Sequence, residues 1–170
     1  MSLPRLEAAF KALHSLDGLV VSAGIQSDEG QETLDGPETL AQVATELHFG
    51  VVAEGNHGDA NMDGWFIPPR PWLQVAFDKR NKRWARLAGK VPRARRKGGG
   101  YQELQQLAAA MVGDCQESLL DEPWTPNAPL TIELKGSDQP LVDTGRLNQS
   151  HRAVIQFPDD GERIVVNGVA

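Results

Sequence analysis

The sequence predicts an α+β protein in which a small antiparallel sheet packs against helices and long loops form interfaces. Apolar residues recur at helical spacing in several stretches, and two β-branched runs near the end of the chain flank a turn signal. Gly and Pro concentrate in two intervening segments. The 170 residues are 40% hydrophobic, which suffices for the core of one domain. We therefore expect a single α+β domain over residues 1–170, with extended loops at about 50–71 and 123–140.

The first third of the chain predicts a helix, a strand and a second helix. Apolar residues first recur at helical spacing at Leu3, Leu6, Phe10 and Leu13. The short apolar run 19–25 predicts a strand, and the polar, acidic run 27–36 predicts a loop. Pro37 suits a first helical turn, and Gly50 is placed to end this helix. Between them, one apolar face is formed by Leu40, Val43, Ala44 and Leu47.

The middle of the chain predicts two long helical stretches with a basic segment between them. One stretch begins at Trp72, directly after a proline-rich run. The other begins at Tyr101, and its apolar positions are Leu104, Leu107, Ala108, Met111, Val112, Cys115 and Leu119. Pro92 and the triple glycine 98–100 interrupt the basic segment.

The last part of the chain predicts a short helix and a β-hairpin. Residues 131–134 form either a turn of helix or a strand, ended by Gly136. Thr144 can cap a short helix that runs to Ser150, because its hydroxyl can accept an orphan backbone N–H. The β-type runs 152–157 and 163–166 flank a Pro-Asp-Asp-Gly turn, which is typical of a hairpin.

Charge is unevenly distributed along the chain. The formal net charge is −6, yet the window from Lys79 to Lys97 carries +10 and contains no acidic residue, so the rest carries −16. This window is either a solvated helix face with a mobile loop, or a surface that binds phosphate or an acidic partner. In the second case we expect contact with a nucleic-acid backbone without sequence reading. The densest part is a basic patch of Arg93, Arg95, Arg96 and Lys97.

Several function classes lack support in the sequence. Cys115 is the only cysteine, so no internal disulfide forms, and no apolar run reaches the ~18 residues of a membrane helix. We expect Cys115 to be a small buried hydrophobic residue. The run 57–63 resembles a calcium loop in places but lacks the terminal Glu. Without a nucleophile elbow or P-loop, we expect no enzyme activity, cofactor or metal site, and a small hydrolase or metal enzyme ranks last.

Two segments together resemble a known family. The first contains LHFG (47–50), IPPRPWL (67–73) and AFD (76–78). The second contains PNAPLTI (126–132), KGS (135–137), PLVDTGRL (140–147) and Ser150. In this order they are similar to the neck and tail-completion proteins of tailed bacteriophages, which are also described as virion-morphogenesis or tail-component proteins. The resemblance extends from about Ala41 to Phe157.

The resemblance implies a structural virion protein that forms a ring at the neck or at the head-proximal end of the tail. Both tail completion and head–tail joining fit it. It also implies a homo-oligomer, most simply a hexamer, whose partners are other phage neck and tail proteins, with non-specific contact to phage DNA and none to membranes. The expected location is the virion, and the host cytoplasm during assembly. The alternative is a nucleic-acid-binding accessory protein that acts through residues 79–97.

Two groups of residues are the candidate sites. An interface is expected at Trp65, Phe66, Pro68, Pro69, Arg70, Pro71 and Trp72. The prolines there would pre-set an extended path, and the aromatic side chains would anchor a partner, with ordinary core packing as the alternative. A structural motif is expected at Asp143, Thr144, Gly145, Leu147 and Ser150, where a capped turn would place the leucine in the core.

Overall fold

The computed structural model describes residues 3–26, 30–31, 38–53, 65–142, 145–158 and 161–167. Its elements in chain order are α1 (Leu3–His14), β1 (Val20–Ile25), α3 (Leu40–Phe49), β2 (Val51–Ala53), β3 (Trp65–Ile67), α4 (Trp72–Ala88), α5 (Val91–Arg95), α6 (Tyr101–Asp121), α7 (Pro129–Lys135), α8 (Arg146–Gln149), β4 (His151–Gln156) and β5 (Arg163–Asn167). This is an α+β structure with antiparallel sheets, so the predicted fold class is confirmed.

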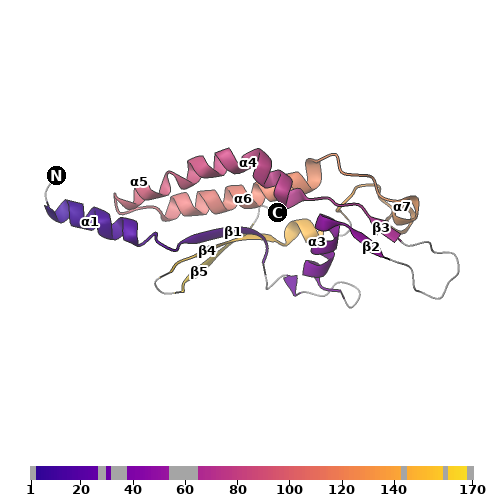
Figure 1. Cartoon of the computed structure of the whole chain (residues 1–170), viewed down its shortest axis with the longest axis horizontal. Coiled ribbons are helices and arrows are strands. Elements are labelled where there is room, and N and C mark those ends of the chain that lie inside the picture. Colours follow the sequence, from indigo (N-terminus) through magenta and orange to yellow (C-terminus); the bar gives the residue numbers. More distant parts are fainter. Residues whose placement is uncertain are drawn as a thin grey trace.

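A three-stranded antiparallel sheet in the order β1–β4–β5 forms one layer of the molecule. The central strand pairs Ala153 with Ala23 on one side and Ile155 with Ile164 on the other. The helix α6 lies across this sheet and contacts all three strands, while α4 packs along α6 as the outer layer (Figure 1). The strands β2 and β3 pair separately as a short antiparallel ribbon.

Helix α6 builds the core because its apolar positions follow one helical period. Its buried apolar residues are Leu104, Leu107, Ala108, Val112, Cys115 and Leu119, as the sequence predicts, and Met111 is half-buried. Leu119 belongs to a cluster with Leu40, Ala44, Trp72, Leu141 and Leu147. A second cluster contains Leu104, Ala108, Val112, Val91, Ala153 and Ile155. One helix therefore connects both clusters.

Helix α3 begins at Leu40 rather than at Pro37, which lies outside the described residues. Thr39 is its N-cap: the Thr39 hydroxyl accepts the Gln42 backbone N–H at 3.3 Å, and the Gln42 side chain accepts the Thr39 backbone N–H at 2.8 Å. This reciprocal capping box satisfies two backbone donors at once and so fixes the start of the helix. Gly50 ends the helix as predicted, with φ 76° and its N–H bonded to Glu46.

Both predicted loops contain regular structure. The stretch 50–71 includes β2 and β3, which pair Val51 with Ile67. The stretch 123–140 includes α7, which begins with Pro129 in its first turn and ends at Gly136 in a left-handed conformation. Residues 131–134 are therefore helical, not extended. The run 57–63, which resembles a calcium loop in the sequence, lies outside the described residues.

The elements are spread along one axis of an elongated molecule (Figure 1). At one end, α1 extends beyond the sheet and contacts α5. At the other end lie α3, the β2–β3 ribbon and α7. Within the described ranges, no helix is both long and apolar enough to cross a lipid bilayer.

Candidate functional site

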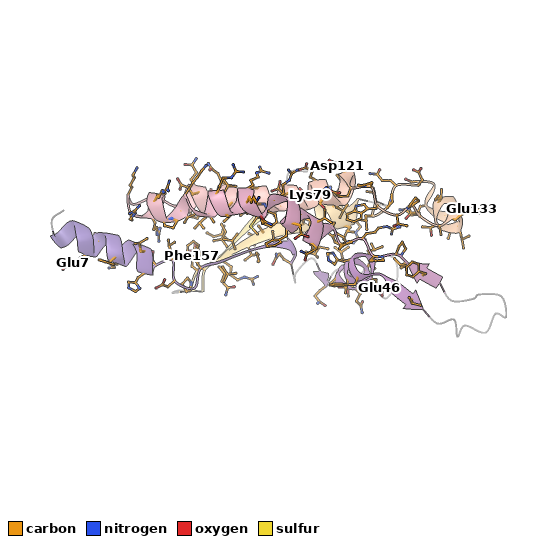
Figure 2. The ribbon with its side chains drawn as sticks, turned by 45° about the horizontal axis from the view of Figure 1, so that its top comes forward. Glu7, Glu46, Lys79, Asp121, Glu133 and Phe157 are labelled. Atoms are coloured by element: carbon orange, nitrogen blue, oxygen red, sulfur yellow. The ribbon has the colours of Figure 1, made fainter. Side chains whose placement is uncertain are left out.

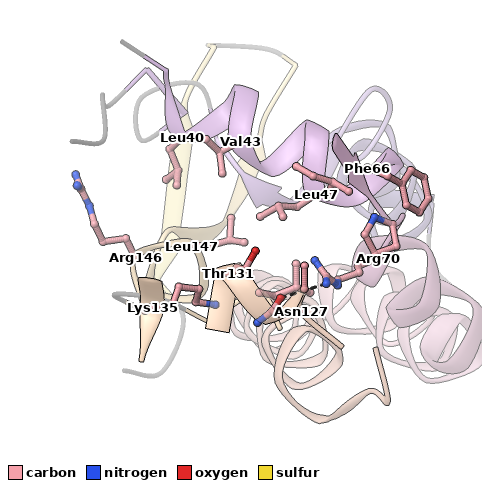
Figure 3. A pocket seen from close by; sticks show the side chains of 15 residues that line it. Leu40, Val43, Leu47, Phe66, Arg70, Asn127, Thr131, Lys135, Arg146 and Leu147 are labelled. Carbon is pink, nitrogen blue, oxygen red and sulfur yellow. Dashed lines mark hydrogen bonds between the residues drawn. The ribbon is translucent and has the colours of Figure 1, made fainter. Parts of the chain in front are cut away.

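A groove of about 320 Å³ lies between α3 and α7. Helix α3 supplies one wall through Leu40, Val43 and Leu47, which recur at helical spacing on one face (Figure 3). Leu141 and Leu147 contribute further apolar surface. The groove is therefore an apolar recess, of the kind that binds apolar side chains of a partner.

Helix α7 forms the opposite wall with its polar side. Thr131 and Lys135 line the groove (Figure 3), and the Lys135 ammonium donates to the Gln139 carbonyl at 3.1 Å. Leu130 and Leu134 do not line the groove and are 58% and 79% exposed. Helix α7 therefore presents leucines one turn apart to solvent, which is the reverse of an ordinary surface helix.

Arg70 is a buried residue whose side chain binds the segment before α7. Its side chain is 4% exposed and donates to the Thr125 carbonyl at 2.9 Å and 3.2 Å and to Asn127 Oδ1 at 3.2 Å. Burial lowers the pKa of Arg70. This guanidinium fixes the segment before α7 against the start of α4, because its planar donors match several fixed oxygens at once.

The ionisable side chains among the described lining residues of the groove are cationic: Arg70, Lys135 and Arg146. The described lining residues include no Asp, Glu, His or Cys, so the lining supplies no carboxylate or imidazole base and no thiol nucleophile. Cys115 lies elsewhere, buried in α6, and burial raises the pKa of its thiol to about 12. The thiol is thus protonated near neutral pH, and the expectation of a buried hydrophobic cysteine is confirmed.

Trp72 and His151 form a buried pair next to Leu147, which lines the groove. Trp72 Nε1 donates to His151 Nε2 at 3.0 Å, and His151 Nδ1 lies 3.0 Å from the Leu147 carbonyl. Because indole is only a donor, the proton of His151 must be on Nδ1, and the ring is neutral. Burial lowers the pKa of His151. The rings of His48 and Trp72 meet edge to face at 5.0 Å.

The structure divides the predicted interface residues into two groups. Phe66 is 63% exposed, and Phe66 and Pro68 both line the groove. Pro69 is exposed and Pro71 is half-buried, while the side chain of Trp65 lies outside the described part.

Arg70 and Trp72 have only 4% and 1% of their surface exposed. Arg70 borders the groove, but both residues have almost no free surface for a partner, so their assignment as interface anchors is corrected. For Trp72, the alternative of core packing applies.

The predicted structural motif is partly described. Gly145 has φ 79° and is the N-cap of α8. Leu147 is in the core, and the Ser150 hydroxyl donates to the Arg146 carbonyl at 2.7 Å. Asp143 and Thr144 lie outside the described residues.

The first part of the basic segment is paired with α6. Lys79 contacts Glu122 at 2.5 Å, Arg80 contacts Glu117 at 2.6 Å, and Arg83 contacts Asp114. Asp114 is buried and also accepts the Trp84 indole N–H at 2.6 Å. Lys79 and Asp121 lie in the middle of the molecule, and Glu133 lies at the end far from Glu7 (Figure 2).

The predicted basic patch lies at the far end of the same hairpin. Arg93 is on α5, and Arg96 and Lys97 follow it; all three side chains are exposed. Arg95 is half-buried, and its Nε donates to Ser15 Oγ at 3.1 Å, which ties α5 to the turn after α1. Figure 1 shows α5 towards one end of the molecule and α7 at the other, so the patch on α5 and the groove beside α7 lie at opposite ends.

Sequence reasoning missed the groove and the role of Asp114. The groove gives no local signal, since its walls come from separate parts of the chain. Asp114 does give a local signal, because it is an acidic residue directly beside Cys115 in the apolar series that predicts α6. A comparison with protein-family models, with curated proteins and with solved structures finds no match to this chain.

Proposed function

We propose that this protein is a structural subunit of a tailed-bacteriophage virion, which assembles into a ring at the neck or at the head-proximal end of the tail. The order of its sequence motifs supports the phage assignment. The observation that carries the assembly is a set of exposed apolar side chains on the elements at the groove end of the molecule. Phe49 on α3, Val52 on β2, Phe66 on β3, and Leu130 and Leu134 on α7 are 58–79% exposed, and Phe66 also lines the groove.

An apolar surface of this kind favours contact with another protein. Large exposed apolar side chains gathered beside a recess mark interaction sites, because monomers in water rarely leave such surfaces uncovered. Phe66 and Val52 are directly paired across β2 and β3, so both point to the same side of the ribbon. A contact between this end and a different surface of a second copy is heterologous, and it generates a ring when the rotation closes.

The other parts of the proposal follow from the resemblance. The homo-oligomer is most simply a hexamer, its partners are neck and tail proteins, and its place is the virion after assembly in the host cytoplasm. The role is structural and not enzymatic. The described lining of the groove supports a binding role, since it is mostly apolar.

The test measures the mass of the assembled protein in solution and compares the unchanged protein with a matched pair of variants. Leu130→Gln/Leu134→Gln removes the exposed leucines of α7, and Val20→Thr/Val165→Thr removes exposed valines from the three-stranded sheet. We expect sedimentation velocity to show a discrete oligomer for the unchanged protein and for the valine variant, but a monomer for the leucine variant. Electron microscopy of the oligomer should show a closed ring.

Two results would contradict the assembly part of the proposal. A monomer at every concentration excludes ring assembly by this chain alone. An oligomer that survives the leucine variant places the contact elsewhere. For the virion assignment, antibodies to the protein should label the junction of head and tail in particles that contain it, and labelling along the tail shaft would contradict it.

A further inference from the structure

The tip of the α4–α6 hairpin carries a group of exposed cations. Among the described residues, no acidic side chain forms an ion pair with any of them. The group, here named the tip cations, consists of Lys82, Arg86, Lys90, Arg93, Arg96 and Lys97. The acidic partners of the basic segment lie further along, where they pair with Lys79, Arg80 and Arg83.

The tip cations follow a helical path. Gly89, Lys90 and Arg96 all have right-handed helical backbone angles, so the path continues from α4 through α5. Five of the tip cations are three or four residues apart in the sequence, at positions 82, 86, 90, 93 and 97. Residues at this spacing share one side of a helix and are about 6 Å apart along its axis. The charges therefore form a row.

The facing helix leaves this row uncompensated. In the second half of α6, the acidic residues Asp114 and Glu117 meet the start of the basic segment. In the first half, which lies beside α5, the exposed polar residues are Gln102, Gln105 and Gln106. Residues 101–113 contain a single acid, Glu103. Glutamine is uncharged, so these residues do not neutralise the row of cations, and their amide groups add hydrogen-bond donors.

We propose that the hairpin tip binds the phosphate backbone of double-stranded DNA without reading its sequence. Lys, Arg and Gln are among the side chains that contact phosphate oxygens. Within 82–97 the one aromatic residue is Trp84, which is half-buried and bonded to Asp114. Among the described residues, Tyr101 at the start of α6 is therefore the one exposed aromatic side chain next to the row, fewer than single-strand binding by stacking uses. This inference does not depend on ring assembly, because the groove lies at the other end of the molecule.

The test compares two variants that remove the same amount of charge. Arg93→Gln/Arg96→Gln changes the tip cations, and Lys79→Gln/Arg80→Gln changes cations that are already paired with α6. Binding of a 30-base-pair duplex is followed by fluorescence anisotropy from 50 to 200 mM salt. We expect the tip variant to lower the slope of log K against log salt by about 2 and the paired variant to leave it nearly unchanged.

Additional measurements distinguish DNA from an acidic protein as the anionic ligand. A duplex of the same length and unrelated sequence should bind equally well, and circular dichroism should show that both variants keep their helices. No duplex binding at 50 mM salt overturns the proposal, as does an equal loss in both variants. Tighter binding of polyglutamate than of DNA also overturns it, since the tip would then fit an acidic protein surface.

Discussion

His151 is the side chain that joins the first turn of α4 to the start of the central strand. It is fully buried, accepts the Trp72 indole N–H at 3.0 Å and lies 3.0 Å from the Leu147 carbonyl. Both of its nitrogens are therefore used in the neutral form. Protonation would place a second hydrogen on Nε2, facing the indole N–H, which is itself a donor.

This geometry predicts a pH dependence of stability. Burial lowers the pKa of His151 below its ordinary value of 6.5, so below pH 6.5 the unfolded chain binds a proton that the folded chain does not. The unfolding free energy should therefore fall as the pH drops below about 6.5, by up to about 1.4 kcal/mol per pH unit. Burial lowers the pKa of His48 as well, which adds to the slope in the same direction.

Urea unfolding at pH 7.5 and at pH 5.5 measures this effect. The variant His151→Gln should be less stable at pH 7.5, because it loses the two buried hydrogen bonds, but its stability should depend less on pH. A variant with the unchanged slope would show that another group titrates.

Gly50 and Gly113 form a second residue-scale test. Gly50 has φ 76° and ψ 160°, and a Cβ there would lie 2.8 Å from the Ile67 carbonyl oxygen. Gly50→Ala should lower the unfolding free energy by about 2 kcal/mol or more, because this backbone region is almost confined to glycine.

Gly113 lies inside α6, and a Cβ there would meet no side chain or neighbouring element within 4 Å. Gly113→Ala should instead stabilise the protein, by up to about 1 kcal/mol. Thermal unfolding distinguishes the two, and shifts of the same sign would contradict the expectation.

At the scale of elements, the α4–α6 hairpin combines one buried carboxylate with exposed ion pairs. Asp114 is 3% exposed and receives bonds from Arg83 and Trp84, whereas Glu117 is exposed and pairs with Arg80. Asp114→Asn should lower the unfolding free energy by about 1–2 kcal/mol, a figure reduced for the solvent exposure of the arginines. Glu117→Gln should change it by less than about 1 kcal/mol. Equal effects in chemical denaturation would show that burial of Asp114 is unimportant.

Periodic elements could be predicted from the sequence, and pairings between distant residues could not. Helix α6 follows one apolar period over its whole length, so its core face is readable directly. The strands β2 and β3 are three residues each, which is shorter than the run that defines a strand signal. The predicted start of α3 is wrong because Pro37 is a general helix signal, whereas the capping box depends on Gln42.

The candidate sites show the same limit. The basic window is visible in the sequence, but the partners that neutralise Lys79, Arg80 and Arg83 lie 31 to 43 residues away. The division into paired cations and tip cations therefore needs the fold. The groove likewise depends on α3, α7 and α8 coming together, and the exposed leucines of α7 give no sign of it in the sequence.

At the scale of the whole molecule, the two core clusters should unfold together. Leu119 is 0% exposed in one cluster and Leu104 is 4% exposed in the other, and both belong to α6. Leu119→Ala and Leu104→Ala should each cost about 2–5 kcal/mol and should shift one common transition. Urea titrations followed by tryptophan fluorescence and by circular dichroism should coincide. Separate transitions for the two signals would show that the clusters are independent.

The placement of the groove and the tip cations at opposite ends has a consequence for how salt acts on the molecule. Helix α4 alone has 17 residues, which is about 25 Å of separation along the hairpin. Added salt screens the charged end and, when the ions are strongly excluded ones such as sulfate, strengthens contacts at the apolar end. In a ring of this chain with the hairpin along the ring axis, one rim would carry the tip cations and the other the apolar surface. Added sulfate would then weaken charge-dependent contacts at the first rim and strengthen apolar contacts at the second.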